Sequence, residues 1–453
     1  MRPLNDPRLE SQMTLLCCLL LLAASGCWAT PHTNTLLAEA EGIRHWVVGL
    51  RRQLHRVPEL GWHEQKTAAA VTAVLTELGI PYEQGVAGTG VVGHLGTGPG
   101  PVVMLRADMD GLPIQEPEGL DFQSQHPGAM HACGHDGHMA MLLGAARLLK
   151  AREQLGQVHG RVKLVLQPFE EGGAGADKMV KHGVLEGVQA AFGLHVMPFL
   201  PSGVFASRPG TIMAGALSFH INITGRGGHA AMPHLNVDPV VAAAAVITAL
   251  QTLVSRETSP LGSAVLSVTL LRAGDSYNVI PDVAQLGGTI RALDHEAMMR
   301  LQSRVGSLSE GVAQGYGCSA EVDWRQDQQP YYPPTVNDAA VERVTQQMAA
   351  KLLGADKVVQ VEPIMPAEDF SFYCQQVPCT FGFLGIRNET LGSVHNLHSP
   401  QFLLDESVLH KGAALHAAWA LTYLDLLNAE ALEASGSGQA PDAPNGLAAR
   451  DEL

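Results

Sequence analysis

The sequence has no long run of lysine or arginine, and its formal net charge is −15 over 453 residues. A nucleic acid partner is therefore not expected, because phosphate binding needs a basic surface. An acidic surface still allows a small-molecule substrate with a carboxylate, which one or two local cations can receive. The chain contains 46% hydrophobic and 16% charged residues, which is ordinary for a folded globular protein, and its length favours two domains.

Two common catalytic motifs are also missing. The glycine-rich segment 225–234 lacks the Gly-Lys-Ser/Thr of a phosphate-binding loop, which excludes that kind of nucleotide site. There is no Gly-x-Ser-x-Gly nucleophile elbow of the kind that α/β-hydrolases use. The sequence also has no internal repeats, which argues against a solenoid.

The beginning of the chain has the features of a targeting segment. Arg2 and Arg8 precede an uncharged apolar stretch at residues 14–24, which is shorter than the ~20 residues that span a bilayer. Small residues follow up to Ala29. We expect residues 1–29 to be a cleaved signal peptide, with an uncleaved membrane anchor as the alternative, and no stable membrane span after cleavage.

The end of the chain agrees with entry into the secretory pathway. Residues 429–453 are rich in Ala, Ser, Gly, Pro and Asp and are expected to form a flexible tail. The chain closes with Arg-Asp-Glu-Leu at residues 450–453, a near match to the Lys-Asp-Glu-Leu type of retention signal. These features predict a location in the lumen of the endoplasmic reticulum and binding to its retention receptor.

Seven cysteines are too few for a disulfide-rich scaffold in a chain of this length. Four remain after signal removal: Cys133, Cys318, Cys374 and Cys379. Cys374 and Cys379 could pair in an oxidising lumen, which the sequence alone does not decide. Glycosylation sequons occur at Asn222, inside a strand pattern, and at Asn388, which is the better acceptor.

Strand and helix patterns alternate along most of the chain, which predicts an α/β layer architecture. Helical spacing covers residues 36–78 and 138–150, and strand patterns cover 90–95, 102–106, 162–167 and 190–196. Functional residues of such sheets collect at the carboxyl ends of the strands. Candidate residues near 133–138, 170–171 and 195 all lie at such positions.

A second unit interrupts this pattern. Strand, helix, strand, strand, helix and strand patterns follow one another at residues 217–224, 238–256, 264–271, 283–293, 296–314 and 320–325. This βαββαβ order is that of a ferredoxin-like domain. We therefore predict a catalytic α/β domain in two parts, residues 36–214 and 330–428, with a ferredoxin-like domain inserted at residues 215–329.

The densest group of chemical residues lies at 131–138, where three histidines, one cysteine and one aspartate occur within eight residues. Gly134 and Gly137 permit tight turns that let neighbouring side chains converge. Thiolate and imidazole donors suit Zn²⁺, Mn²⁺, Co²⁺ or Ni²⁺ rather than Ca²⁺. The alternatives are a nucleophilic cysteine with a histidine base and a polar loop with incidental histidines.

Adjacent glutamates follow the strand pattern at 162–167. Because neighbouring side chains point in different directions, one of Glu170 and Glu171 can bind a metal while the other stays free as a base. The alternative is a pair of solvated surface acids. His195 and His398 also end apolar segments, although a lone histidine is more often structural.

In their order and amino-acid sequence these segments resemble those of the auxin-conjugate amidohydrolases of plants and their bacterial hippurate-hydrolase-like relatives. These enzymes belong to the two-metal aminoacylase and carboxypeptidase family. The resemblance runs from about Ile43 to Leu427. It includes the segments 106–113, 131–138, 167–173, 193–195, 225–234, 277–281, 368–371 and 397–400. It implies a metal-binding α/β domain with an inserted ferredoxin-like domain that serves as lid or dimerisation domain.

The resemblance also implies roles for individual residues. Two divalent ions, with Mn²⁺ favoured over Zn²⁺, Co²⁺ and Ni²⁺, would be held by Cys133, His135, Glu171, His195 and His398, with Cys133 bridging. Glu170 would be the general base. His229 would stabilise the oxyanion, and in relatives that form dimers it can come from the neighbouring subunit. Asn278, His234 or Arg291 would hold the substrate carboxylate.

The implied reaction is hydrolysis of N-acyl amino acids, with indole-3-acetyl-amino acid conjugates as favoured substrates. Two other functions stay open: a general N-acyl-amino-acid or dipeptide hydrolase, and an inactive lumenal binding protein with the same fold. The intact ligand set and Glu170 argue against the binding protein. Phe169 departs from the alanine that is commoner in the family, and we expect its ring to narrow the acyl pocket.

Overall fold

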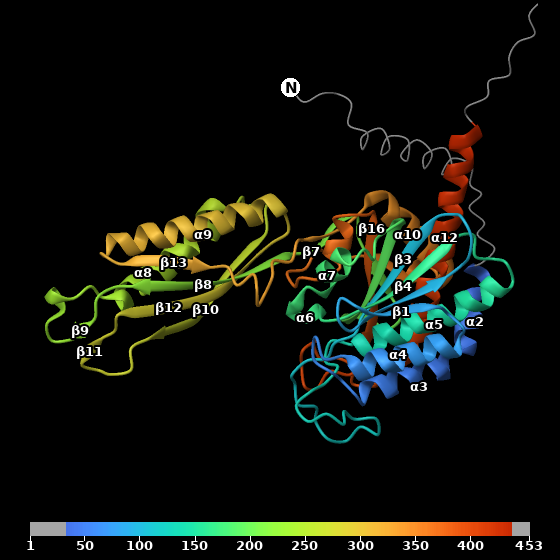
Figure 1. Cartoon of the computed structure of the whole chain (residues 1–453), viewed down its shortest axis with the longest axis horizontal. Helices are drawn as coiled ribbons and strands as arrows, with labels where there is room; N and C mark the ends of the chain where they lie inside the picture. The colour runs from blue at the N-terminus through green and yellow to red at the C-terminus, as the bar shows by residue number, and fades with distance from the viewer. Residues whose placement is uncertain (1–32, 437–453) are drawn as a thin grey trace, which may run out of the picture.

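The computed structural model describes residues 33–436, and the predicted signal peptide and retention sequence lie outside this range. Two bodies of different size are visible (Figure 1). The large unit combines the beginning and the end of the described chain, and the small unit contains its middle. This is the mixed α/β fold with an inserted ferredoxin-like unit that the sequence predicts.

The large unit is built on an eight-stranded sheet with the order β1-β2-β4-β3-β5-β16-β6-β15. The strands are β1 Tyr82–Val86, β2 Gly90–Leu95, β3 Val102–Asp108, β4 Arg161–Gln167, β5 Val188–Pro201, β6 Phe205–Ser207, β15 Val358–Gln360 and β16 Cys379–Arg387. The central strands β4, β3, β5 and β16 run parallel, so their carboxyl ends meet at one edge. Every residue of β3 is buried, as expected for a strand covered on both faces.

Helices cover both faces of this sheet (Figure 1). One core cluster involves α2 Thr33–Gly42, α3 Arg44–His55, α4 Gln65–Glu77, α5 His135–Gln154, α10 Ala339–Leu353 and α12 Leu409–Gly436. On the opposite face, α7 Gly175–Lys181 and α11 Ser371–Cys374 contribute to a second cluster. The two layers fix the sheet between them and leave its strand ends free to carry side chains.

The small unit has a four-stranded antiparallel sheet with the order β10-β12-β8-β13. Its elements are β8 Gly215–Thr224, α8 Pro239–Thr252, β10 Ala264–Ala273, β12 Val283–Ala292, α9 His295–Gly315 and β13 Ser319–Asp323. Alternate residues of β8 are buried against α8 and α9, and the other face of the sheet carries no helix (Figure 1). This open face contributes to the site described below.

Two chain segments connect the units, and they lie side by side. The N–H of Ala216 donates to the carbonyl of Tyr332 over 2.9 Å, and the N–H of Tyr332 donates back to the carbonyl of Ala216 over 3.0 Å. Next to this bridge, β7 Gly210–Met213 pairs with β14 Thr335–Asn337. These hydrogen bonds form a compact hinge, which we define as residues 214–216 and 330–332.

Several local predictions differ from the structure. The helical pattern at 36–78 forms three helices, and β1 has no counterpart in the prediction, because its residues are nearly all exposed and show no apolar alternation. Helix α12 continues through residues 429–436, where the strong helix formers Ala, Glu and Leu delay the predicted tail. A disulfide joins Cys374 and Cys379.

In the described range, one helical stretch is long and apolar enough to cross a membrane by length and composition, namely Pro239–Glu257. It comprises α8 and a following π-helical turn, Leu253–Glu257, and its apolar side packs against the small sheet. This packing accounts for the apolar composition of the stretch within the fold.

Candidate metal centre

Five predicted metal ligands gather at the carboxyl edge of the large sheet. Cys133 precedes α5, His135 begins that helix, and Glu171 follows β4 in the short helical turn α6, Glu170–Gly173. His195 lies within β5, and His398 lies on the loop after β16. The N–H of His398 donates to the carbonyl of Ala132 over 2.9 Å, which ties the last ligand loop to the cysteine loop.

Among the groups of side chains that could hold an ion, two contain all five predicted ligands and share one residue. Cys133, His135 and His195 form one group, and Cys133, Glu171 and His398 form the other. Within each group all donor atoms lie within 4.8 Å of one another. A thiolate common to two three-residue groups is the arrangement that two bridged cations require, and the mixed sulfur, nitrogen and oxygen donors suit borderline transition ions.

Backbone carbonyls set the tautomers of two histidines. Nδ1 of His135 donates to the carbonyl of Asp110 over 2.8 Å, and Nδ1 of His195 donates to the carbonyl of Val196 over 2.7 Å. In the neutral form of each ring Nε2 then carries the lone pair, which is the form that binds metals. Nε2 of His195 lies 3.4 Å from the Cys133 sulfur, so the free nitrogen faces the shared donor.

His138 belongs to the same sequence cluster, but both of its ring nitrogens are already hydrogen bonded. Its Nδ1 donates to Asp108 over 2.6 Å, and its Nε2 accepts the N–H of Val196 over 2.9 Å. A histidine with both nitrogens engaged cannot serve as a ligand without losing a buried hydrogen bond. His138 is therefore held between Asp108 and the strand that carries His195.

Unpaired atoms at the centre fit bound cations. Nε2 of His135 is buried and has no hydrogen-bond partner. Burial and the nearby carboxylates of Glu171 and Glu170 raise the pKa of the Cys133 thiol well above its usual range. A thiolate at this position therefore needs positive charge beside it, and two divalent ions held by these donors would supply that charge.

The environment of Glu170 differs from that of the adjacent Glu171. Its side chain is buried, and burial together with Glu368 and Glu171 raises the pKa of its carboxyl well above the ordinary value. The carboxylate of Asp110 accepts the N–H of Glu170 over 2.9 Å and the N–H of Glu171 over 3.1 Å. The backbone is therefore fixed while the Glu170 carboxyl remains able to exchange a proton.

Sequence reasoning gave no role to a buried ion network beside this base. Arg106 donates to Asp108 over 2.8 Å and to Asp369 over 2.9 Å, and lies 3.0 Å from Glu368. Gln167 also donates to Asp369 over 2.9 Å. Arg106 and Asp108 lie at the end of β3, whereas Glu368 and Asp369 lie on the loop before α11, so only the first pair carried a local signal at a strand end.

Phe169 is not among the residues that line the pocket of the metal donors. Its φ of 40° is left-handed, and the ring packs edge-on against Trp62 with centroids 5.3 Å apart. A Cβ atom on Gly61 or on Gly173 would overlap this ring. The ring therefore occupies a slot between two glycines and does not line the catalytic pocket.

A pocket of about 800 Å³ opens in front of the centre. The large unit contributes Glu170, Glu171, His398, Leu397 and Phe199 to its lining. The open face of the small sheet contributes Ser218, Ser267, Thr289 and Arg291, and Tyr332 lies between the two sides. Of the predicted carboxylate-binding residues, Arg291 thus shares a pocket with the metal donors.

His229, His234 and Asn278 lie elsewhere. His229 is in the short strand β9, Gly228–His229, which pairs with β11, Val279–Ile280, at the outer end of the small unit (Figure 1). The N–H of Ala230 donates to the carbonyl of Asn278 over 3.0 Å, so these residues form one local group. All three side chains are exposed, and none lines the pocket of the metal donors.

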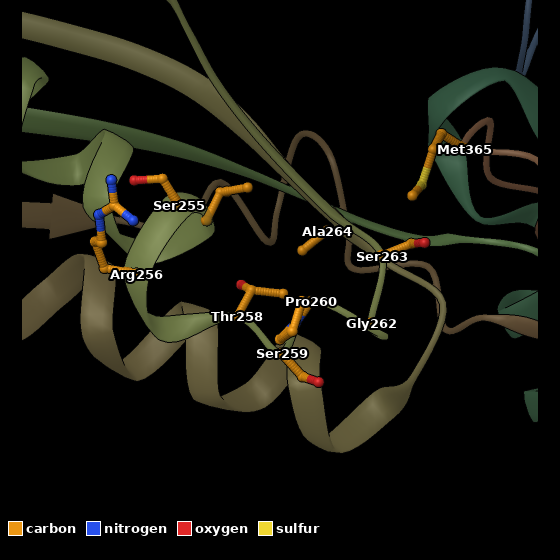
Figure 2. Close-up of a pocket in the computed structure, with 10 residues that line it drawn as sticks. Ser255, Arg256, Thr258, Ser259, Pro260, Gly262, Ser263, Ala264 and Met365 are labelled. Atoms are coloured by element: carbon orange, nitrogen blue, oxygen red, sulfur yellow. The ribbon is translucent and has the colours of Figure 1, made fainter.

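A second hollow, of about 620 Å³, lies at the junction of the units and is lined by residues 254–256, 258–260 and 262–264 and by Met365 (Figure 2). Ser255, Arg256 and Ser259 give it a polar wall, and no metal donor takes part. It shares only Met365 with the catalytic pocket. The chemistry therefore belongs to the pocket at the sheet edge.

The profile of peptidase family M20/M25/M40 matches residues 104–422. The chain is 44% identical over 422 residues to IAA-amino acid hydrolase ILR1-like 4 of Arabidopsis thaliana, covering 93% of this chain and 94% of that protein. It is 40% identical over 385 residues to thermostable carboxypeptidase 1 of Saccharolobus solfataricus, covering 84% and 96%.

Solved structures agree with the sequence matches. The crystal structure of the YXEP protein of Bacillus subtilis, a dinuclear metal-binding peptidase of the M20 family, superimposes with a TM-score of 0.73. It is 36% identical, and the match covers 85% of this chain and 99% of that protein. The chain therefore belongs to peptidase family M20/M25/M40 and is a metal-dependent amidohydrolase with a two-metal centre.

Proposed function

We propose that the protein hydrolyses the amide bond of N-acyl amino acids, with indole-3-acetyl-amino acid conjugates as favoured substrates. The observation that carries the proposal is a pocket in which metal donors and Arg291 share one space. A guanidinium suits the carboxylate of an amino acid, and Ser218, Ser267 and Thr289 surround it with hydroxyl groups. The similarity to the Arabidopsis hydrolase supports the acyl group.

The other side of the pocket suits an aromatic acyl group. Phe199 is 64% exposed although it follows a buried segment of β5, and it lines the pocket together with Leu397. Covering an exposed phenyl ring with an apolar ring of the substrate lowers the free energy of the complex. A substrate with its carboxylate at Arg291 and its ring at Phe199 would span both units.

The bound ions and the residues around them then have different roles in the reaction. Bound divalent ions supply Lewis acidity, which makes water a nucleophile at neutral pH and polarises a carbonyl oxygen. Glu170 accepts the proton of the attacking water and donates it to the leaving nitrogen. Asp110 holds the backbone of Glu170 during both transfers.

A homodimer would complete the site. His229 is exposed at the outer end of the small unit and does not line the pocket of Glu170 in the same chain. We propose that His229 stabilises the oxyanion that forms in the active site of a neighbouring subunit. His234 and Asn278 lie beside it and would contact the substrate carboxylate there. Exposed apolar residues near this end, among them Leu270, Leu271 and Val279, would be covered by such an interface.

The metal and the compartment complete the proposal. Mn²⁺ is our favoured ion, with Zn²⁺, Co²⁺ and Ni²⁺ as alternatives.

We place the protein in the lumen of the endoplasmic reticulum, where a disulfide such as Cys374–Cys379 persists. Removing residues 450–453 should send the protein into the medium because the retention receptor no longer binds it. Unchanged retention would reject this location.

The substrate is tested with metal-depleted protein reloaded with each of the four ions. Alanine conjugates of indole-3-acetyl, benzoyl and acetyl groups are compared with a dipeptide by kcat/KM. We expect the indole conjugate to be cleaved fastest. Phe199→Ala should lower kcat/KM for the two aromatic conjugates about threefold to tenfold and leave the acetyl conjugate unchanged, whereas the control Tyr316→Ala, at an exposed ring on the end of α9, should change neither.

The alternatives give different results. A preference for the dipeptide or the acetyl conjugate would identify a general hydrolase. No turnover of any compound with stoichiometric metal bound would identify a lumenal binding protein.

A further inference from the structure

Tyr332 occupies an unusual place, because it belongs to the hinge and also reaches the catalytic loop. Its backbone N–H and carbonyl both pair with Ala216 on the other connection. Its ring is buried and packs edge-on against Phe372 with centroids 6.0 Å apart. The phenol end points into the loop that follows β4 and also borders the pocket.

The phenol makes three hydrogen bonds, all to the backbone of this loop. It donates to the carbonyl of Glu170 over 2.5 Å, and it accepts the N–H of Gly172 over 3.1 Å and the N–H of Ala174 over 2.9 Å. One donor proton and two lone pairs exhaust the capacity of a phenol. Burial raises the pKa of this phenol, so it keeps the proton that it donates.

The loop needs such support because its backbone is strained. Phe169, Gly172 and Ala174 all adopt positive φ angles, of 40°, 97° and 49°. A left-handed conformation is unfavourable for Phe and Ala and persists only where surrounding contacts enforce it. Glu170 and Glu171 lie between these residues, so the enforced conformation decides where both carboxylates point.

The other groups that hold this loop come from the large unit. Glu64 accepts the N–H of Phe169 over 2.9 Å, Asp110 accepts those of Glu170 and Glu171, and Asp369 accepts that of Ala176 over 3.0 Å. Among the side chains that bind this loop in the described structure, Tyr332 alone belongs to a connection to the small unit.

We propose that Tyr332 is a positioning residue that couples the orientation of the small unit to the position of Glu170. A rotation of the hinge moves the Tyr332 backbone, and its phenol transmits the movement to the carbonyl of Glu170 and to the turn behind it. The base is then correctly placed only in those orientations of the small unit that keep the three hydrogen bonds. The proposal deepens the proposed function and rests on Glu170 as the base.

Tyr332→Phe removes the three hydrogen bonds and keeps the ring. We expect kcat to fall about tenfold to a hundredfold, since small displacements of a catalytic group have effects of this size. KM should stay within about twofold, and metal content should be unchanged. The matched control is Tyr82→Phe, whose phenol accepts a hydrogen bond from Thr76 over 3.3 Å at the edge strand β1, away from the hinge and the pocket, and should leave both constants as they are.

Hydrogen exchange of the metal-loaded protein without substrate provides a second readout that does not depend on the proposed reaction. In Tyr332→Phe, the peptide that contains Gly172 and Ala174 should exchange faster. Because coupling between two sites is reciprocal, the hinge peptide that contains Ala216 should also exchange faster. Peptides of the central strands and of α9 should match the wild type.

The outcomes are distinct. Faster exchange in the loop and the hinge together with a reduced kcat supports the proposal. Wild-type exchange in the loop overturns it, as does a uniform increase over the whole large unit, which would indicate general destabilisation. Faster exchange in the loop with an unchanged kcat overturns the role in positioning the base. An incorrect substrate assignment would leave the exchange results unaffected.

Discussion

The edge of the large sheet and the outer end of the small unit carry similar residues in very different surroundings. At the sheet edge, donor atoms from distant segments form groups of three within 4.8 Å of one another, and most of the side chains are buried. At the outer end, His229, His234 and Asn278 are exposed and do not line the pocket that contains Glu170. Strand order fixes the first group, whereas the second can act only after a change in domain orientation or assembly with another chain.

The largest test of this comparison exchanges the two adjacent glutamates for glutamine. Glu170→Gln should retain both metals and lose about 10²–10⁴-fold in kcat, because the proton acceptor is gone. Glu171→Gln should lose metal, with activity partly recovered at high metal concentration, because a ligand is weakened. Metal stoichiometry measured beside turnover separates the two. If Glu170→Gln loses metal and Glu171→Gln keeps it, the two roles are reversed.

The next test asks whether the outer end works in a second chain. His229→Ala should lower kcat about 10²–10³-fold, as expected when one oxyanion donor is removed. Mixing unfolded His229→Ala and Glu170→Gln chains and refolding them should restore about a quarter of the wild-type activity, because half of the dimers gain one intact site. If the mixture stays as inactive as its components, His229 acts within its own chain or not at all.

A third test concerns how rigidly the sheet edge is packed. Gly61→Ala places a methyl group against the Phe169 ring and should destabilise the protein by about 1–3 kcal/mol. Adding Phe169→Ala should remove most of this cost, so the double-mutant cycle measured by thermal unfolding should be strongly non-additive. Gly49→Ala, in α3 with nothing within 4 Å of the new methyl group, is the matched control and should be neutral or stabilising. Additive effects would place the ring elsewhere.

The smallest expected effect concerns a carboxyl group whose pKa is raised by burial alone, away from the charged residues of the metal centre. Glu342 in α10 is buried with Ser207 and Gln346 as partners, and burial raises the pKa of its carboxyl to about 7. The folded state therefore favours the protonated form. Its contribution to stability is complete below about pH 4.5 and is lost as the pH rises through about 7.

Glu342→Gln cannot ionise, so its melting temperature relative to the wild type should rise by a few degrees, about 2–4 °C, between pH 5 and pH 8. The exposed control Glu310→Gln should show no such trend. A constant difference for Glu342→Gln would mean that burial alone does not raise a carboxyl pKa in this core.

Much of the fold could be predicted from the sequence because its signals are local. The βαββαβ order and the central strands follow from apolar periodicity. Glu171 closely follows β4 and Cys133 and His135 lie at the start of α5, and the structure brings these three residues together. The direction of the Phe169 ring depends on a positive φ that no composition signal reveals. The role of Tyr332 depends on a hydroxyl that meets a loop more than 150 residues away, at sequence separations of 158 to 162.

The two connections of the small unit have a consequence for how proteins of this shape can diversify. Because Ala216 and Tyr332 are hydrogen bonded to each other, the inserted segment leaves the large unit and returns to it at almost the same point. An insertion with adjacent ends can be lengthened, replaced or deleted without rethreading the large sheet. Substrate preference and assembly can therefore change by exchange of one cassette, while the metal-binding half is inherited intact.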